Sequence, residues 1–199
     1  MKILIGCEYS GIVREAFRAK GHDVWSCDLL DTEIPGQHIK GDILDILNDG
    51  WDIMIAFPPC TYLSHAGNRA LKNNPERKKK QLKAFDFFMQ LYNAPIEKIC
   101  LENPRGWITQ LFRREDQVIE PFYFGEPERK RTCLWLKNLP PLMHTLINPK
   151  GMIPKKIIKR KTGQRKGGNY GYYYVQGKTA KEKARTFQGI ANAMANQWG

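Results

Sequence analysis

The chain has 199 residues, of which 42% are hydrophobic and 11% aromatic, with Lys+Arg 32 against Asp+Glu 20. This length suits one globular domain, and the apolar content is enough for a core, which excludes a wholly disordered chain. No run approaches the ~20 apolar residues of a membrane-spanning helix, so we expect no membrane partner. Glu8 stands where the apolar region of a signal peptide would continue, and we therefore expect a cytoplasmic protein.

The cysteines are five in number and widely spaced, and no two of them form a Cys-x-x-Cys pair. We therefore expect neither a disulfide framework nor a zinc or other metal site. The five are Cys7, Cys27, Cys60, Cys100 and Cys133.

The net charge of +12 is concentrated near the C-terminus. Twelve Lys/Arg and one acid, Glu182, lie between Lys150 and Arg185, whereas the rest of the chain is nearly balanced. This concentration suggests a polyanionic partner; the alternative is a solvated basic segment with no partner. The residues that we expect to contact nucleic acid are Lys155, Lys156, Lys159, Arg160, Lys161, Arg165, Lys166 and Tyr172.

The first half of the chain alternates strand-like and helix-like segments, which predicts an α/β fold with a mostly parallel sheet and crossover helices. In chain order, apolar periodicity and turn residues predict a strand, a helix, a second strand, a short helix and a third strand. Their ranges are 2–6, 12–21, 23–28, 43–47 and 52–57.

The second half begins with a polar, basic stretch, 68–80, which we interpret as a loop leading into a helix with an apolar face at 82–92. A strand follows at 98–101. Segments 118–124 and 132–136 predict two antiparallel strands, because their connection is too short for a parallel crossover. The remaining predictions are a loop or hairpin over 150–178 and a final helix at 187–198.

Polar residues follow the predicted strands at their carboxyl ends, where open parallel sheets bind ligands. A tight turn after the first strand opens a helix, whose amide groups favour an anionic or carboxylate ligand. Asp28 is placed to bind ribose hydroxyls and Asp42 an adenine amino group, although each acid taken singly is more often a cap or turn residue. The candidate residues for an adenosine-containing ligand are Glu8, Tyr9, Ser10, Gly11, Asp28, Leu29, Asp42, Phe57 and Pro58.

Cys60 directly follows two prolines, which fix the turn after the third strand and project the thiol outward. A thiol there, with a helix and many cations nearby, is a candidate nucleophile whose thiolate form we expect to be favoured; the alternative, an inert buried cysteine, we assign to the other four. Glu102 ends the strand that should neighbour it, followed by Asn103 and Pro104, and a desolvated carboxyl group there can serve as an acid. A helix cap or a partner for Arg105 is the alternative for Glu102.

With Pro58-Pro59-Cys60, Glu102-Asn103-Pro104, Asp28 and Asp42 in this order, the chain resembles the DNA cytosine carbon-5 methyltransferases, most of all the short phage-type members. The resemblance covers most of residues 1–136, and residues 185–194 look like the last helical motif of that family. It implies a Rossmann-like S-adenosylmethionine-dependent methyltransferase fold, S-adenosylmethionine as cofactor and DNA as partner.

The same resemblance implies a mechanism. Cys60 would attack carbon-6 of a cytosine flipped out of its duplex, while Glu102 protonates or hydrogen-bonds ring nitrogen-3. Arg131 resembles the arginine that orients the base, with Lys130 as its neighbour. The implied division is a catalytic domain made of residues 1–140 and 185–199, with the basic insertion 141–184 in place of a full target-recognition domain.

Two alternatives stay open at the level of sequence. The basic, tyrosine-rich segment suits RNA as well as DNA, which would make the protein an RNA cytosine methyltransferase. The turn at residues 7–11 keeps only the final glycine of the family's first motif, so the chain could also be a degenerate member that binds nucleic acid without catalysis.

Overall fold

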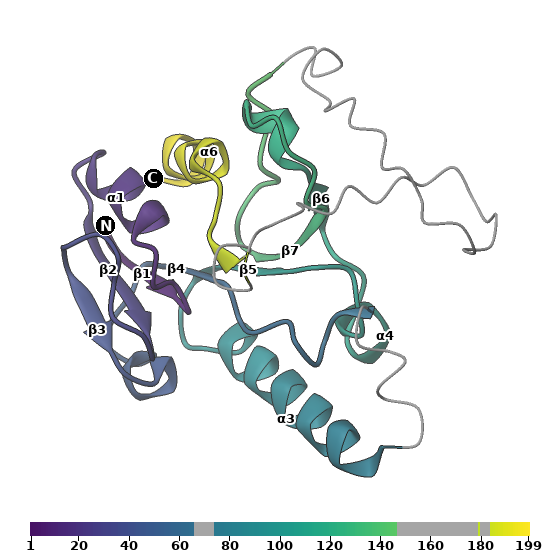
Figure 1. Ribbon diagram of the computed structural model, residues 1–199. Helices are drawn as coiled ribbons and strands as arrows, with labels where there is room; N and C mark the ends of the chain where they lie inside the picture. Colours follow the sequence, from purple (N-terminus) through teal and green to yellow (C-terminus); the bar gives the residue numbers. More distant parts are fainter. Residues whose placement is uncertain (66–73, 147–178, 180–183) are drawn as a thin grey trace.

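The protein is described here by a computed structural model, which covers residues 1–65, 74–146, 179 and 184–199. These residues form one seven-stranded sheet with helices on both faces (Figure 1). The strands are β1 (Lys2–Gly6), β2 (Asp23–Asp28), β3 (His38–Lys40), β4 (Ile53–Ala56), β5 (Lys98–Asn103), β6 (Gln117–Ile119) and β7 (Thr132–Lys137). The helices are α1 (Ile12–Arg18), η1 (Ile43–Ile46), α3 (Pro75–Tyr92), α4 (Ile108–Leu111), η3 (Pro121–Phe124) and α6 (Gln188–Trp198).

The strand order is β3-β2-β1-β4-β5-β7-β6. Strand β7 is antiparallel to both of its neighbours, β5 and β6, and the other four neighbouring pairs are parallel. The predicted fold class, a Rossmann-like, mostly parallel α/β sheet with an antiparallel C-terminal strand pair, is therefore confirmed. Among the described helices, none has the length and apolar character to cross a membrane.

Side chains of the central strands alternate between two hydrophobic clusters, one on each face of the sheet. Ile3 and Ile5 of β1 belong to the cluster under α1 and α6, whereas Leu4 belongs to the cluster under α3. Figure 1 shows α1 and α6 together on one side of the strands and α3 on the other. Because both faces are covered, the central strands consist almost wholly of apolar residues.

Helix α3 begins before the predicted end of the loop at residue 80. Its first residue is Pro75, and the Asn74 Oδ1 atom caps it by accepting from the Arg77 amide at 2.9 Å. Proline suits the first helical position because its missing N–H would have no partner there. The loop prediction was therefore wrong for residues 75–80.

The predicted strand over 118–124 is also only partly right. Strand β6 ends at Ile119, and Pro121 begins the 3-10 turn η3 instead of continuing the strand. Proline has no N–H to donate to a neighbouring strand, so the chain leaves the sheet. In contrast, β5 runs two residues further than predicted, so that Glu102 lies within the strand.

Candidate active site

The residues predicted for ligand binding and chemistry lie at one edge of the sheet. Gly6, at the end of β1, is in register with Cys27 of β2 and with Ala56 of β4. Ala56 is in turn in register with Leu101, the residue before Glu102. The segments that follow these strands are therefore neighbours, as expected for the carboxyl ends of parallel strands.

Two turns at this edge are fixed to each other: the Cys60 turn (residues 58–64) and the Glu102 turn (residues 102–107). The fully buried Asn103 donates from Nδ2 to the Pro58 carbonyl at 2.8 Å. The Trp107 amide donates to the Leu63 carbonyl at 2.7 Å. A side chain at Gly106 would lie 1.9 Å from that same carbonyl oxygen, so the two turns approach each other as closely as glycine permits.

Within the Cys60 turn, the Cys60 carbonyl accepts from the Leu63 and Ser64 amides at 3.0 and 2.9 Å. Cys60 is exposed, and Cys27, Cys100 and Cys133 are buried as predicted, whereas Cys7, in the turn after β1, is only partly buried. Desolvation of the thiol by the surrounding protein raises the pKa of Cys60, and the nearby Glu102 carboxylate raises it further. The expectation of a favoured thiolate was therefore wrong for this structure.

The Lys130 ammonium acts in the opposite direction and lowers the pKa of Cys60. The Glu102 carboxylate and the Lys130 ammonium therefore lie close enough to the thiol to influence its ionisation. Lys130 also stands over the Phe187 ring, 5.9 Å from its centroid.

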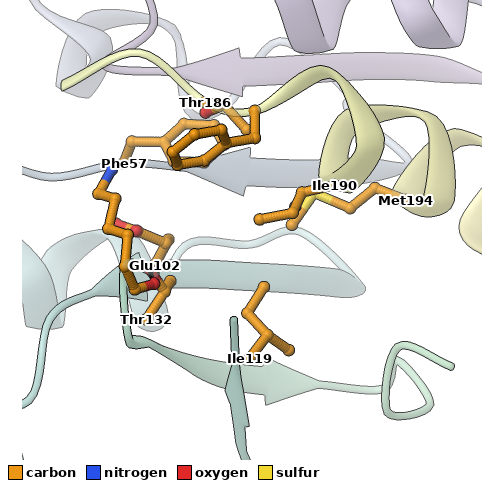
Figure 2. Close-up of a pocket in the computed structure, with 9 residues that line it drawn as sticks. Phe57, Glu102, Ile119, Thr132, Thr186, Ile190 and Met194 are labelled. Atoms are coloured by element: carbon orange, nitrogen blue, oxygen red, sulfur yellow. Dashed lines mark hydrogen bonds between the residues drawn. The ribbon is translucent and has the colours of Figure 1, made fainter. Parts of the chain in front are cut away.

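Glu102 and Lys130 line the same small recess, which opens to solvent. Figure 2 shows Glu102 and Thr132 on one side of it, with Ile190 and Met194 of α6 across from them. The lining is mostly apolar, with one carboxylate and one ammonium. Its residues are Phe57, Glu102, Ile119, Lys130, Thr132, Thr186, Phe187, Ile190 and Met194.

Arg131, the predicted base-orienting residue, lies outside this lining. Its Nε atom is 3.7 Å from Oε1 of Glu120, and 57% of its side chain is exposed. Desolvation raises the pKa of Glu120, while Arg131 opposes that shift. The structure thus places Lys130, and not Arg131, beside Glu102; the role of Arg131 in orienting a base stays a prediction.

The segments that follow β1 and β2, residues 7–11 and 28–38, lie on the other side of β4. We call them together the β1–β2 edge. Glu8 is 4% exposed, and its Oε1 atom accepts from the Ser10 hydroxyl at 2.6 Å and from the Val13 amide at 3.2 Å. Burial raises the pKa of Glu8. Its second oxygen, Oε2, is buried with no hydrogen-bond partner among the described residues. One carboxylate oxygen therefore serves helix α1.

Asp28 and Asp42 both have local roles. Asp28 Oδ1 accepts from the Leu30 amide at 3.0 Å, and Asp42 Oδ1 accepts from the Leu44 amide at 3.0 Å as the cap of η1. Burial raises the pKa of Cys7 to about 12, and both carboxylates contribute, so the two acids lie near the end of β1. Leu29, beside Asp28, is 72% exposed.

Sequence reasoning missed Arg14, which lies in α1 and is fully buried. Its Nη1 atom donates to Ser26 Oγ at 2.9 Å and to Thr32 Oγ1 at 3.2 Å, and its Nη2 atom donates to the Ile34 carbonyl. A side chain at Gly36 would lie 2.8 Å from the guanidinium. Arg14 therefore holds residues 28–38 against α1. Arg14 lies three residues before Phe17, on the apolar side of this helix, and that position was the available signal.

Arg185, the last residue of the basic run and the first of the segment 185–194, joins the same edge. Its guanidinium makes two contacts of 2.8 Å with Glu33, whose amide donates to the Tyr9 carbonyl at 2.8 Å. Burial and the Glu33 charge raise the pKa of Tyr9, whereas a hydrogen bond with Arg185 lowers it. All eight residues predicted to contact nucleic acid, Lys155, Lys156, Lys159, Arg160, Lys161, Arg165, Lys166 and Tyr172, lie outside the described residues.

No family model and no curated protein matches the chain. Among solved structures, it is similar to a protein assigned as a DNA modification methyltransferase encoded within a prophage (E. coli), with a TM-score of 0.44 and 13% identity over 68% of this chain and 46% of that one. It is also similar to a DNMT2 variant from Spodoptera frugiperda, with a TM-score of 0.42 and 15% identity over 73% of this chain and 53% of that one. The chain thus spans about half the length of these two structures.

Proposed function

We propose that the protein transfers a methyl group from S-adenosylmethionine to carbon-5 of cytosine in DNA, with Cys60 as the nucleophile and Glu102 as its partner. The observation that carries this proposal is the 2.8 Å bond from Asn103 to the Pro58 carbonyl. It joins the Cys60 turn to the Glu102 turn, so that a thiol and a carboxyl group arise side by side from neighbouring strands. Their coupling through charge supports the same pairing.

The chemistry follows from what each group can do to a cytosine ring. The Cys60 thiolate adds to carbon-6, and Glu102 hydrogen-bonds or protonates nitrogen-3, which relieves the negative charge that this addition places on the ring. Carbon-5 then becomes nucleophilic enough to take the methyl group. Loss of the carbon-5 proton to solvent and expulsion of the Cys60 thiolate restore the ring double bond and free the enzyme.

The β1–β2 edge fits the proposed cofactor, which supplies an electrophilic methyl group on a sulfonium. The buried Oε2 atom of Glu8 can accept from an ammonium group such as that of the methionine part. The exposed Leu29 offers an apolar surface for an adenine ring, with Asp28 beside it for the ribose hydroxyls. We assign Asp42 to the adenine amino group. Tyr9, Ser10, Gly11, Phe57 and Pro58 complete the proposed binding residues.

Within a duplex, base stacking covers the ring faces at carbon-5 and carbon-6 of a cytosine, so the target base has to be flipped out. We assign recognition of the flipped base to the recess beside Glu102, with Lys130 and Arg131 as its cations. Contacts with the phosphates of the substrate are assigned to the basic insertion, residues 141–184.

A trapping assay with DNA that contains 5-fluorocytosine tests this proposal. Fluorine at carbon-5 cannot leave as the proton does, so we expect a covalent protein–DNA adduct that forms only in the presence of S-adenosylmethionine. Cys60→Ala should form none, whereas Cys133→Ala, which alters a buried cysteine of β7, should form it normally. A wild-type protein that binds the DNA but gives no adduct would refute the enzyme and leave a nucleic-acid-binding protein.

The same assay decides between the two nucleic acids. Fluorocytosine RNA of the same sequence is offered in competition with the DNA, and we expect the adduct on DNA. An adduct on RNA alone would keep the chemistry and change the substrate class.

A further inference from the structure

The first two turns of α3 carry a run of cations next to the Cys60 turn. Four basic residues are consecutive, a fifth follows, and only one acid accompanies them in the range 75–83. The basic residues are Arg77, Lys78, Lys79, Lys80 and Lys83, and the acid is Glu76. The four lysines are exposed, and Arg77 is half-buried.

Helix α3 is fixed against the Cys60 turn by two of its side chains. Arg77 donates to the Thr61 carbonyl at 3.4 Å and lies over the Tyr62 ring, 5.1 Å from its centroid. The buried Gln81, one turn later, donates to the Tyr62 carbonyl at 3.3 Å. The face of α3 that carries these two residues therefore adjoins the turn of the proposed nucleophile.

Cations in this position work against the helix itself. The N-terminal end of a helix carries a partial positive charge that favours acids and disfavours lysine or arginine, and like charges one turn apart repel each other. Glu76 is in the favoured place, and it pairs with Lys79 at 3.1 Å. Local choices that oppose the stability of an element are typical of functional surfaces. A polyanion bound here would relieve this repulsion.

Helical geometry separates the four lysines into two pairs. At about 100° per residue, Lys78 and Lys80 lie on the two flanks of Arg77, about 100° to one side and about 60° to the other. Lys79 and Lys83 lie on the side of the helix turned away from Arg77. Only the first pair therefore borders the Cys60 turn.

We propose that Lys78 and Lys80 contact the phosphate backbone of the nucleic acid on either side of the base that Cys60 attacks. This inference rests on the proposed function, because it takes nucleic acid as the substrate. It adds a contact surface within the described part of the chain, beside the nucleophile and separate from the basic insertion. Lysine suits the role because a compact ammonium on a flexible stem binds phosphate without a fixed geometry.

Two double variants of equal charge test this surface in the full-length protein: Lys78→Gln with Lys80→Gln, and Lys79→Gln with Lys83→Gln. The probe is a fluorescein-labelled, cytosine-containing DNA duplex, and its Kd is measured over a series of salt concentrations without cofactor. We expect the first double variant to weaken binding roughly tenfold and to reduce the slope of log Kd against log salt by about 1.5 to 2. The second should stay within about twofold of the wild type.

Equal weakening by the two double variants, or no weakening by either, would overturn the proposal. Thermal unfolding of both variants is the control for folding. We expect both to fold, since glutamine keeps the helix propensity of lysine. The fluorocytosine adduct is measured separately. A difference between the doubles without any adduct would retain the surface and refute the methyl transfer. An adduct with no difference between the two double variants would support the methyl transfer and refute the proposed surface.

Discussion

The β1–β2 edge and the Cys60 turn stand at the same end of the sheet but are held in different ways. At the β1–β2 edge, polar side chains hold one another: Ser10 donates to Glu8, and Arg14 donates to Ser26 and Thr32. In the Cys60 turn, the contacts come from backbone amides and from the side chains of Asn103, Arg77 and Gln81, which all donate to backbone carbonyls of the turn.

The two kinds of contact suit two different tasks: ligand binding at the β1–β2 edge and chemistry at the Cys60 turn. A network of side chains around residues 28–38 gives a fixed surface, which suits a ligand that must be held in one orientation. A turn fixed through its backbone leaves the Cys60 side chain exposed for reaction. Damage to one region should therefore leave the other intact, and the predictions below are arranged to separate the two.

The largest effect is expected from Arg14→Met, which removes the buried guanidinium of the β1–β2 edge. The Ile34 carbonyl and the Thr32 and Ser26 hydroxyls lose a buried donor, so the free energy of unfolding should fall by about 3 kcal/mol in urea titrations. Arg18→Met is the matched control, because Arg18 pairs with Glu15 as Arg14 does but is 60% exposed.

Arg18→Met should cost at most about 1 kcal/mol. Arg14→Met should also weaken binding of S-adenosylmethionine in calorimetry, while the rate at which iodoacetamide alkylates Cys60 stays unchanged. If Arg14→Met were as mild as Arg18→Met, the edge would not depend on this network.

Asn103→Ala alters the Cys60 turn and leaves the β1–β2 edge unchanged. Loss of the bond to the Pro58 carbonyl should lower the free energy of unfolding by about 1–2 kcal/mol and should lower kcat for methyl transfer, with cofactor affinity retained. The control is Gln117→Ala, which removes the amide that donates to the Leu142 carbonyl at 2.7 Å, away from the site. Its stability should fall similarly and its kcat should not. Equal kcat in the two variants would contradict a positioning role for Asn103.

Much of the fold could be predicted because the central strands are apolar on both faces and end at polar turns. The segments 2–6, 23–28 and 52–57 gave the correct strands within a residue or so. Strand β3 was missed, since its three residues are partly exposed and show no apolar alternation. The start of α3 was misplaced although Asn74 and Pro75 form a recognisable cap.

The candidate site was predictable where residue type and strand order suffice, and not where distant segments meet. Asp28, Cys60 and Glu102 follow or end strands that the pattern identified, so their common edge is a consequence of the sheet. Asp42 follows β3, the strand that was missed. The contact between Glu33 and Arg185 joins residues 152 positions apart, and no periodicity reports such a pair. The bond from Asn103 to Pro58 is invisible for the same reason, even though both motifs were recognised.

The third prediction concerns the charge balance around Cys60. The thiolate is the reacting form, so alkylation of Cys60 by iodoacetamide should accelerate as pH rises through a pKa that desolvation and Glu102 have raised. Glu102→Gln removes the negative charge and should move this pH profile to lower pH. Lys130→Gln removes the opposing positive charge and should move it to higher pH.

Mass spectrometry of the peptide that contains Cys60 gives the profile without interference from the other cysteines. Glu102→Gln should also abolish methyl transfer, so the variant with the more readily ionised thiol is the one that cannot complete the reaction. Shifts of the same sign in both variants would contradict the arrangement of the three groups.

The smallest effect is expected from Arg185→Ala, which removes the contact between the segment before α6 and Glu33 of the β1–β2 edge. A paired but partly exposed arginine contributes little to folding, and we expect a loss of about 0.5–1 kcal/mol. Its effect should instead fall on the cofactor: Glu33 is bonded to Tyr9 through the backbone, so loss of the Arg185 contact loosens the proposed binding turn. The KM for S-adenosylmethionine should rise about threefold, roughly 0.6 kcal/mol, with kcat unchanged.

Lys40→Ala is the matched control for this variant, because Lys40 also pairs with an acid of residues 28–38, Asp31, at 2.9 Å. Both partners of that pair are largely exposed, so its removal should change neither KM nor stability. Arg185→Lys keeps the charge without the two-pronged contact and should fall between the wild type and Arg185→Ala. If Lys40→Ala raised KM as much as Arg185→Ala did, the effect would come from the net charge of the edge, and the specific contact with Glu33 would be irrelevant to cofactor binding.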